Sequence, residues 1–144
     1  MCVDYRRLND VTEKPVFVLP DSTYLFDQLS GCKYFCSIDM CQGYHQIKIN
    51  ETDVPKTAFT SKTGHYAFIR MPFGLLGALM TFQKNMNHIL KGLNWKICLI
   101  YLDNICIFSN TLKEHKERLR NVRSAIKNSG IKLSPKKCSF LKKN

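Results

Sequence analysis

Two acidic residues in strand-like surroundings are the first candidates for chemistry in this sequence. Asp103 interrupts an apolar, β-favouring stretch at Ile97–Phe108, and Asp39 lies near the end of another at Lys33–Met40. An ionised carboxylate at the centre of a sheet is costly unless it is paired or bound to a metal. If the two acids meet in space, divalent cations would relieve their repulsion. Two such cations about 3.5–4 Å apart can activate an attacking hydroxyl and stabilise a leaving phosphate oxygen.

Each acid also has an ordinary structural explanation. Asp39 alone could face solvent at the end of a strand, and Asp103 with Asn104 could form a hairpin turn, since Asp and Asn are turn residues. Both acids together, in one topology, favour the metal site. A zinc site is a weaker alternative, because the spacing of its candidate ligands matches no common pattern. These ligands would be Cys36, Cys41 and His45.

The elements around the two acids decide whether they can meet. From residue 33, the sequence first predicts a strand at Lys33–Met40 and a hairpin of Lys56–Ser61 and His65–Arg70 around Lys62-Thr63-Gly64. A helix follows, with one face at Leu79, Phe82, Met86, Ile89 and Leu93, and then the hairpin Ile97–Phe108 around Asp103-Asn104. The last two elements are a helix with one face at Leu112, His115, Leu119, Val122 and Ile126, and a strand at Cys138–Leu141. Apart from the first hairpin, this is the split β-α-β-β-α-β plan of ferredoxin-like α+β folds, with an antiparallel sheet and two helices on one face. Its first strand neighbours its central hairpin, so Asp39 and Asp103 can converge on the open face.

Local signals set the ends of several elements. Thr111 and Glu114 predict a capping box for the second helix, and Gly130 predicts its end. Ahead of residue 33, the sequence predicts a strand at Val3–Leu8, an extended connector at Pro15–Pro20, and a short helix at Asp21–Ser30 that Asp21 caps and Gly31 ends.

The composition indicates one globular domain outside the membrane. A chain of 144 residues is long enough to bury a real core. No apolar stretch approaches the roughly 18 residues of a membrane span, and no signal peptide opens the sequence. The seven cysteines are odd in number and include no C-x-x-C pair, which is typical of free thiols in a reducing compartment. We therefore expect an intracellular protein that is not secreted.

The positive charge is concentrated in one part of the sequence. The net charge is +11, and residues 91–144 hold 13 lysines and arginines against 3 acidic residues. A basic half beside a neutral half indicates a polyanionic partner, nucleic acid first. The alternative is a solvated helix face with a charged tail.

Several stretches resemble, in order and spacing, the motifs of one family. They are Val3–Asn9, Asp27–Gly31, Ser37–Asp39, Gly43–Ile47, Lys56–Phe59, Gly64–Tyr66, Met71–Leu75, Thr81–Gln83, Tyr101–Asp103 and Lys137–Phe140. The sequence thereby resembles the fingers–palm part of a reverse transcriptase from Ty3/gypsy-type long-terminal-repeat retrotransposons, and collinear motifs are more specific than any one of them. The resemblance implies one partial domain over 1–144, without thumb or ribonuclease H. Its fingers would span about 1–32 and 48–74, and its palm about 33–47 and 75–144.

The resemblance also implies an activity, RNA-directed DNA polymerase. In this nucleotidyltransferase reaction a primer 3′-hydroxyl attacks the α-phosphate of a dNTP. Asp39 and Asp103 would ligate two Mg²⁺ ions, or Mn²⁺, with the backbone carbonyl of Met40 as a further ligand. The partners would be an RNA template, a DNA primer, dNTP and the rest of a Pol polyprotein, in the cytoplasm, a retroelement particle or the nucleus.

A second group of residues would bind the nucleotide, again by resemblance. The backbone amides of Gln42 and Gly43 would meet the triphosphate. Tyr44 would lie under the deoxyribose and clash with a 2′-hydroxyl, which would select dNTP over rNTP. Phe73 and Gly74 would border the nucleotide and the template.

The sequence departs from the family at two places. The family ends its central hairpin with two acids, but the second position here is Asn104. Asn keeps the shape and the turn preference but removes a negative charge, so it is a poorer ligand for hard divalent ions. We expect a catalytic loss of roughly 10²-fold or more, by analogy with other charge-placing groups. The family's Thr-Asn-Ala-Pro-Ala is replaced by Leu76–Met80, whose larger side chains could crowd the template.

Two hypotheses follow for the function. The first is an RNA-directed DNA polymerase. The second is a catalytically decayed, truncated retroelement fragment that at most binds nucleic acid. Asn104 and the missing ends favour the second as the description of this chain's own activity.

Overall fold

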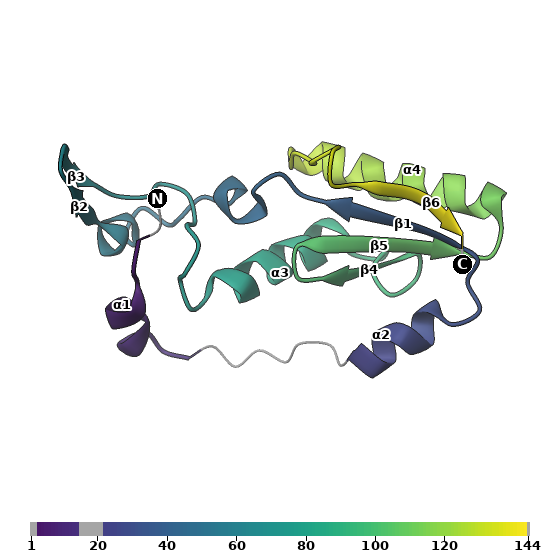
Figure 1. Ribbon diagram of the computed structural model, residues 1–144, viewed down its shortest axis with the longest axis horizontal. Helices are drawn as coiled ribbons and strands as arrows, with labels where there is room; N and C mark the ends of the chain where they lie inside the picture. Colours follow the sequence, from purple (N-terminus) through teal and green to yellow (C-terminus); the bar gives the residue numbers. More distant parts are fainter. Residues whose placement is uncertain (1–2, 15–21, 144) are drawn as a thin grey trace.

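The computed structural model describes residues 3–14 and 22–143. Its elements are α1 (Arg6–Asp10), α2 (Ser22–Leu29), β1 (Tyr34–Asp39), the 3-10 helices η1 (Gly43–Gln46) and η2 (Val54–Thr57), β2 (Phe59–Ser61), β3 (Gly64–Tyr66), α3 (Ala78–Ile89), β4 (Cys98–Tyr101), β5 (Asn104–Ser109), α4 (Leu112–Ser129) and β6 (Ser139–Lys143). Figure 1 shows the larger sheet with α3 and α4 in one region, and the β2–β3 hairpin at the opposite end of the long axis. Within the described ranges, no helix is both long and apolar enough to cross a membrane.

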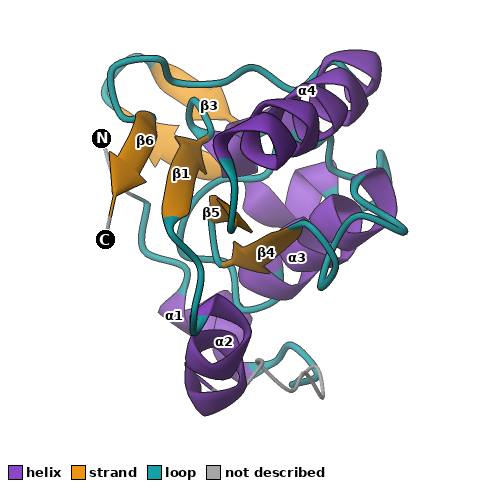
Figure 2. Ribbon diagram, turned by 90° about the vertical axis from the view of Figure 1, so that its right-hand side faces the viewer, coloured by secondary structure: helices purple, strands orange, loops and turns teal. Residues whose placement is uncertain are grey.

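An antiparallel sheet of four strands forms the centre of the larger region. Its strand order is β4-β5-β1-β6, with β1 paired to both β5 and β6. The helices α3 and α4 lie together on one side of this sheet (Figure 2). The arrangement is the predicted split β-α-β-β-α-β plan, so the α+β fold class is confirmed.

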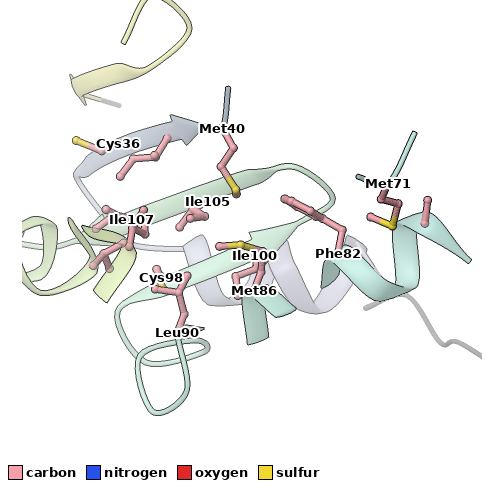
Figure 3. Close-up of a cluster of buried hydrophobic side chains, with 14 residues drawn as sticks. Cys36, Met40, Met71, Phe82, Met86, Leu90, Cys98, Ile100, Ile105 and Ile107 are labelled. Carbon is pink, nitrogen blue, oxygen red and sulfur yellow. The ribbon is translucent and has the colours of Figure 1, made fainter. Parts of the chain in front are cut away.

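The hydrophobic core fills the space between the sheet and these two helices (Figure 3). Ile100 of β4 and Ile105 and Ile107 of β5 are at most 2% exposed. Phe82 and Met86 of α3 pack in the same cluster and are equally buried. Burial of each such side chain contributes about 1.5–3 kcal/mol, so this core fixes the strands that carry the candidate site.

Helix α4 begins and ends where its capping residues predict. Thr111 Oγ1 accepts a hydrogen bond from the amide of Glu114 at 3.3 Å, and Gly130 takes a left-handed φ of 75°. The Glu114 carboxylate accepts the amide of Asn110 at 3.3 Å. The predicted capping is therefore confirmed, with the return bond made to Asn110 rather than to Thr111.

The predicted strand at Val3–Leu8 is wrong, because the chain there forms α1. The Asp4 carboxylate accepts the backbone amide of Arg6 at 3.0 Å and also binds its guanidinium. A side chain that bonds a nearby amide in this way competes with strand pairing and favours a turn of helix. Local hydrogen bonding therefore overrides the β-favouring composition of this stretch.

The helix predicted at Asp21–Ser30 is present as α2. It is followed by Gly31 in a left-handed conformation with φ 77°, as expected for a helix end. The predicted Pro15–Pro20 connector and the cap by Asp21 lie outside the described residues.

Both predicted hairpins are present, but their turns differ from expectation. The β2–β3 hairpin is shorter than predicted. In the β4–β5 hairpin, Tyr101 pairs with Asn104, so the turn consists of Leu102 and Asp103 rather than Asp103 and Asn104. Leu102 has φ 55°, the left-handed conformation that tight two-residue hairpins require. Asn104 is consequently the first residue of β5.

A buried hydrogen-bonded group joins α4 to the sheet. His115 Nε2 lies 2.9 Å from Cys36 Sγ, and its Nδ1 lies 2.9 Å from Ser109 Oγ. The amide of Leu141 donates to Cys36 Sγ at 3.3 Å, beside the register shift between β1 and β6. Burial lowers the pKa of His115 and raises the pKa of the Cys36 thiol, so both side chains are neutral in the folded protein at pH 7.

The lowered pKa of His115 predicts a specific pH dependence of stability. The unfolded chain binds a proton at His115 near pH 6.5, whereas the folded chain binds it only at lower pH. Stability from this group is therefore complete above about pH 6.5 and falls as the pH drops below it. Urea unfolding between pH 8 and pH 5 should show a shallower loss for His115→Gln than for the natural chain.

His88→Gln offers a matched control, because it makes the same substitution at an exposed position without touching the buried group. Urea unfolding of this variant should show the pH dependence of the natural chain. Equal pH dependence in the natural chain and His115→Gln would contradict the assignment.

Candidate metal and nucleotide site

Strand pairing brings the candidate acidic residues to one end of the sheet. Asp39, the last residue of β1, is the pairing partner of Asn104, the first residue of β5. Side chains alternate along a strand, so these two residues face away from the core side of Ile38 and Ile105. Asp103 precedes Asn104 in the β4–β5 turn. The carboxyl end of β1 therefore meets the turn that carries Asp103.

The carboxylate of Asp39 is the most unusual group at this end of the sheet. Its side chain is 14% exposed, and its Oδ1 is buried without a hydrogen-bond partner among the described residues. Lys137 Nζ lies 3.7 Å from this oxygen, beyond hydrogen-bond distance, and the lysine is 68% exposed. An exposed lysine at this distance compensates a buried charge only weakly. Asp39 Oδ1 is therefore a buried carboxylate oxygen without a hydrogen bond, and a bound divalent cation would compensate it.

The backbone around Asp39 is fully engaged, in contrast to its side chain. The carbonyl of Asp39 accepts the amide of Ser134 at 2.9 Å, and the amide of Cys41 donates to the carbonyl of Lys132 at 3.0 Å. These bonds form a bridge between Met40 and Leu133. Neither bond uses the carbonyl of Met40. The ladder therefore fixes the main chain at the position where a backbone ligand was predicted.

Asn104 changes the charge of the site rather than its shape. Its Nδ2 lies 3.4 Å from Asp103 Oδ1, so the amide donates to the neighbouring carboxylate. The described residues contain no group of three or more His, Cys, Asp or Glu residues able to hold a metal ion. Asp39 and Asp103 are the two carboxylates of the candidate site, and Asn104 contributes a neutral amide where a third acid would add a negative charge. The alternative zinc site gains no support, since Cys36 bonds to His115 instead.

The loop after β1 has a constrained backbone. Gln42 takes a left-handed φ of 48°, and its carbonyl accepts the amide of His45 at 2.9 Å to begin η1. A Cβ on Gly43 would lie 2.8 Å from the ring of Phe82, a side chain only 1% exposed. Glycine is therefore required at position 43 for the loop to approach the core. The same contact fixes where the backbone amides of Gln42 and Gly43 lie.

Gln46 holds this loop to the chain that follows α4. Its Nε2 donates to the carbonyls of Cys41 and Lys132 at 2.6 and 2.9 Å, and its Oε1 accepts the amide of Lys132 at 2.7 Å. The sequence assigned no role to Gln46. One partner, Lys132, is 86 positions away, so no local spacing could have indicated the contact.

An aromatic cluster connects the loop to the turn that contains Phe73. The ring of Tyr44 lies 5.2 Å from those of Phe73 and Phe82, and the ring of His45 lies 5.0 Å from Phe73. Burial raises the pKa of the Tyr44 hydroxyl, and the negative charge of Asp103 raises it further. Tyr44 is therefore held between the core and the acidic end of the sheet.

The turn at Gly74 is positioned by a residue that the sequence did not single out. Asn9 Nδ2 donates to the carbonyl of Gly74 at 2.8 Å, and Asn9 Oδ1 accepts the amide of Leu76 at 2.9 Å. Gly74 has φ 91° and lies against the ring of Tyr5, where a Cβ would be 3.6 Å away. Phe73 thus faces Tyr44, while the neighbouring Gly74 packs toward α1.

Comparison with known proteins gives the family to which this fold belongs. The model of the family "Reverse transcriptase (RNA-dependent DNA polymerase)" matches residues 1–144, and the chain belongs to this family. Solved structures agree. The foamy viral protease–reverse transcriptase in complex with double-stranded DNA superposes with a TM-score of 0.88 at 26% identity, over 97% of this chain and 24% of that chain. The same enzyme in complex with RNA/DNA hybrid superposes with a TM-score of 0.85 at 26% identity, over 95% of this chain and 18% of that chain.

Relatives found by sequence narrow the class further, since several are Pol polyproteins of retroelements. The chain is 45% identical to the Pol polyprotein from Drosophila melanogaster transposon 297 over 98% of its length, and 32% identical to that from transposon gypsy over all of it. It spans only 13% and 14% of these polyproteins. It is also 40% identical, over 87% of its length, to an RNA-directed DNA polymerase homolog of Oenothera berteroana, of which it covers 90%. The predicted resemblance to Ty3/gypsy-type reverse transcriptases is confirmed.

The close approach of Gly43 to Phe82 predicts the effect of a single methyl group. Gly43→Ala should lower the free energy of unfolding by about 1–3 kcal/mol, because the ring is enclosed and cannot yield freely. Adding Phe82→Leu should give a double variant that loses less than the sum of the two single losses, since the smaller side chain makes room. Urea unfolding followed by circular dichroism measures each value.

Gly77→Ala serves as the control, because a Cβ there meets nothing within 4 Å. It should lower the free energy of unfolding clearly less than Gly43→Ala does. Strictly additive losses for Gly43→Ala and Phe82→Leu would show that the two sites do not crowd each other.

Proposed function

We propose that this chain is the fingers–palm part of an RNA-directed DNA polymerase domain from a retroelement Pol polyprotein. It would extend a DNA primer on an RNA template by nucleotidyl transfer from dNTP. The observation that carries this proposal is the buried, unbonded Oδ1 of Asp39 opposite the Asp103-Asn104 hairpin, in a chain of the reverse transcriptase family. The foamy viral structures with double-stranded DNA and RNA/DNA hybrid support the choice of partners.

The organisation and location of the domain form part of the same proposal. Residues of about 1–32 and 48–74 would act as fingers, and about 33–47 and 75–144 as palm. The protein would act inside the cell, in the cytoplasm, the nucleus or a retroelement particle.

Reverse transcriptases use divalent metal ions, and the residues at the end of β1 offer suitable ligands. Asp39, Asp103 and the backbone carbonyl of Met40 would hold two Mg²⁺ ions, or Mn²⁺. When bound, such ions supply charge stabilisation for the phosphoryl oxygens and lower the pKa of the attacking hydroxyl. The protein's own contribution is to hold the carboxylates in place through the β1–β5 ladder before any ligand arrives.

The remaining candidate residues would bind the incoming nucleotide. The backbone amides of Gln42 and Gly43 would donate to its triphosphate. Tyr44, held between two aromatic rings, would form a rigid floor under the deoxyribose and exclude a 2′-hydroxyl. Phe73 and Gly74 would border the nucleotide and template, and Asn9 would position their turn.

Asn104 favours a second candidate function for this chain. A site with one acid fewer binds divalent cations more weakly, because a neutral amide replaces a carboxylate. The second candidate is a catalytically decayed retroelement protein that retains the fold and at most binds nucleic acid. The β1–β5 pairing includes Asn104, so the fold does not require an acid there.

Primer extension on an RNA template tests both candidates. Residues 1–144 would be grafted into an intact relative, once as they stand and once with Asn104→Asp, and assayed with Mg²⁺ and with Mn²⁺. We expect the Asp version to incorporate dNTP at least about 10²-fold faster, because it restores a carboxylate ligand for the divalent cations that stabilise the reacting phosphate. The isolated chain should be inactive with either residue.

Equal dNTP incorporation by the two grafts would contradict the role assigned to position 104. Inactivity of both grafts, with correct folding by circular dichroism, would contradict the polymerase proposal and leave the binding protein as the function.

A further inference from the structure

A groove lies between α4 and the edge strand β6, away from the candidate active site. Its volume is about 400 Å³. Its walls combine basic and apolar side chains, namely Lys116, Arg120 and Arg123 with Ile38, Leu119, Leu133 and Phe140. Ile38 is on the helix side of β1, whereas the adjacent Asp39 faces the other side. The groove and the Asp39 carboxylate are therefore on opposite faces of the sheet.

The three cations of the groove are not used by the fold. Lys116, Arg120 and Arg123 are exposed, and in the part of the chain that the structure describes none lies within 4 Å of a carboxylate. Arg118 on the same helix shows the contrast, since it binds Glu114 and the carbonyl of Phe108. Spacings of four and three residues put the three cations in a row about 10 Å long on one helix face. Such a row attracts an extended polyanion.

The apolar wall of the groove supplies a second kind of contact. Phe140 is 55% exposed although it lies on the sheet edge beside α4. Its ring lies beside the basic row, where a base could stack while its phosphates reach the cations. A duplex hides its bases within the helix, so this combination suits unpaired nucleotides. An acidic polypeptide would satisfy the cations but would leave the aromatic ring unused.

We propose that the groove between α4 and β6 binds single-stranded nucleic acid. Lys116, Arg120 and Arg123 contact consecutive phosphates, and Phe140 stacks on a base. The site is additional to the proposed active site and does not depend on catalysis, so a catalytically inactive chain retains it.

Fluorescence anisotropy of a labelled 12-nucleotide oligo-U, measured with the full chain over a range of salt, tests the proposal. The groove variant Lys116→Gln/Arg120→Gln/Arg123→Gln should bind at least about tenfold more weakly at 0.1 M salt. Its slope of log affinity against log salt should fall by about 2, since each phosphate contact on a single strand contributes about 0.7. Phe140→Ala should weaken binding about tenfold and leave that slope unchanged.

A charge-matched control is Lys84→Gln/Lys91→Gln/Lys96→Gln, three exposed lysines outside the groove and outside α4. It should change affinity less than about threefold. Equal weakening by the two triple variants would overturn the proposal in favour of diffuse attraction. Competition by poly-glutamate as strong as by poly-U would point to an acidic protein partner instead. Phe140→Leu, which keeps the apolar bulk, should weaken binding like Phe140→Ala, and unchanged affinity in both would exclude stacking.

Discussion

The antiparallel pairing of β1 with β5 is the constraint on which the rest of the structure depends. It places Asp39 opposite Asn104 and, one residue earlier, Ile38 opposite Ile105. Because side chains alternate along a strand, a slip of one residue would exchange the core face with the face of the site. The same register therefore builds the hydrophobic core under α3 and α4 and presents the acidic residues on the other side. Packing of the core is what holds the site in place before a ligand arrives.

Charge, rather than shape, distinguishes this site from a fully acidic one. Asp39 carries a buried oxygen without a hydrogen bond, and its nearest cation, Lys137, is largely exposed. Burying a carboxylate oxygen without a partner costs free energy, and a protein tolerates this cost where a bound cation removes it. Asn104 keeps the backbone pairing of β5 and donates to Asp103, so the fold gains nothing from an acid at that position. The chain thus keeps the strand pairing of the candidate site while carrying one negative charge fewer there.

The sequence predicted those features that rest on local signals and failed where distant contacts decide. The 3.6-residue period and the Thr111 and Gly130 caps located α4, and the order of elements predicted the sheet. The strand at Val3–Leu8 was wrong because Asp4 bonds the amide two residues later. Gln46 was assigned no role, since its partner Lys132 lies 86 positions away and leaves no trace in the spacing. The β4–β5 turn was predicted one residue late, because composition alone does not set a register.

The central claim is that Asp39 anchors a cation site that lacks one charge. Titration with Mn²⁺, followed by electron paramagnetic resonance of the free ion, measures this without catalysis. We predict weak binding by the natural chain, at least tenfold tighter binding by Asn104→Asp, and loss of binding in Asp39→Asn. Binding that is equal in the natural chain and in Asp39→Asn would contradict the account.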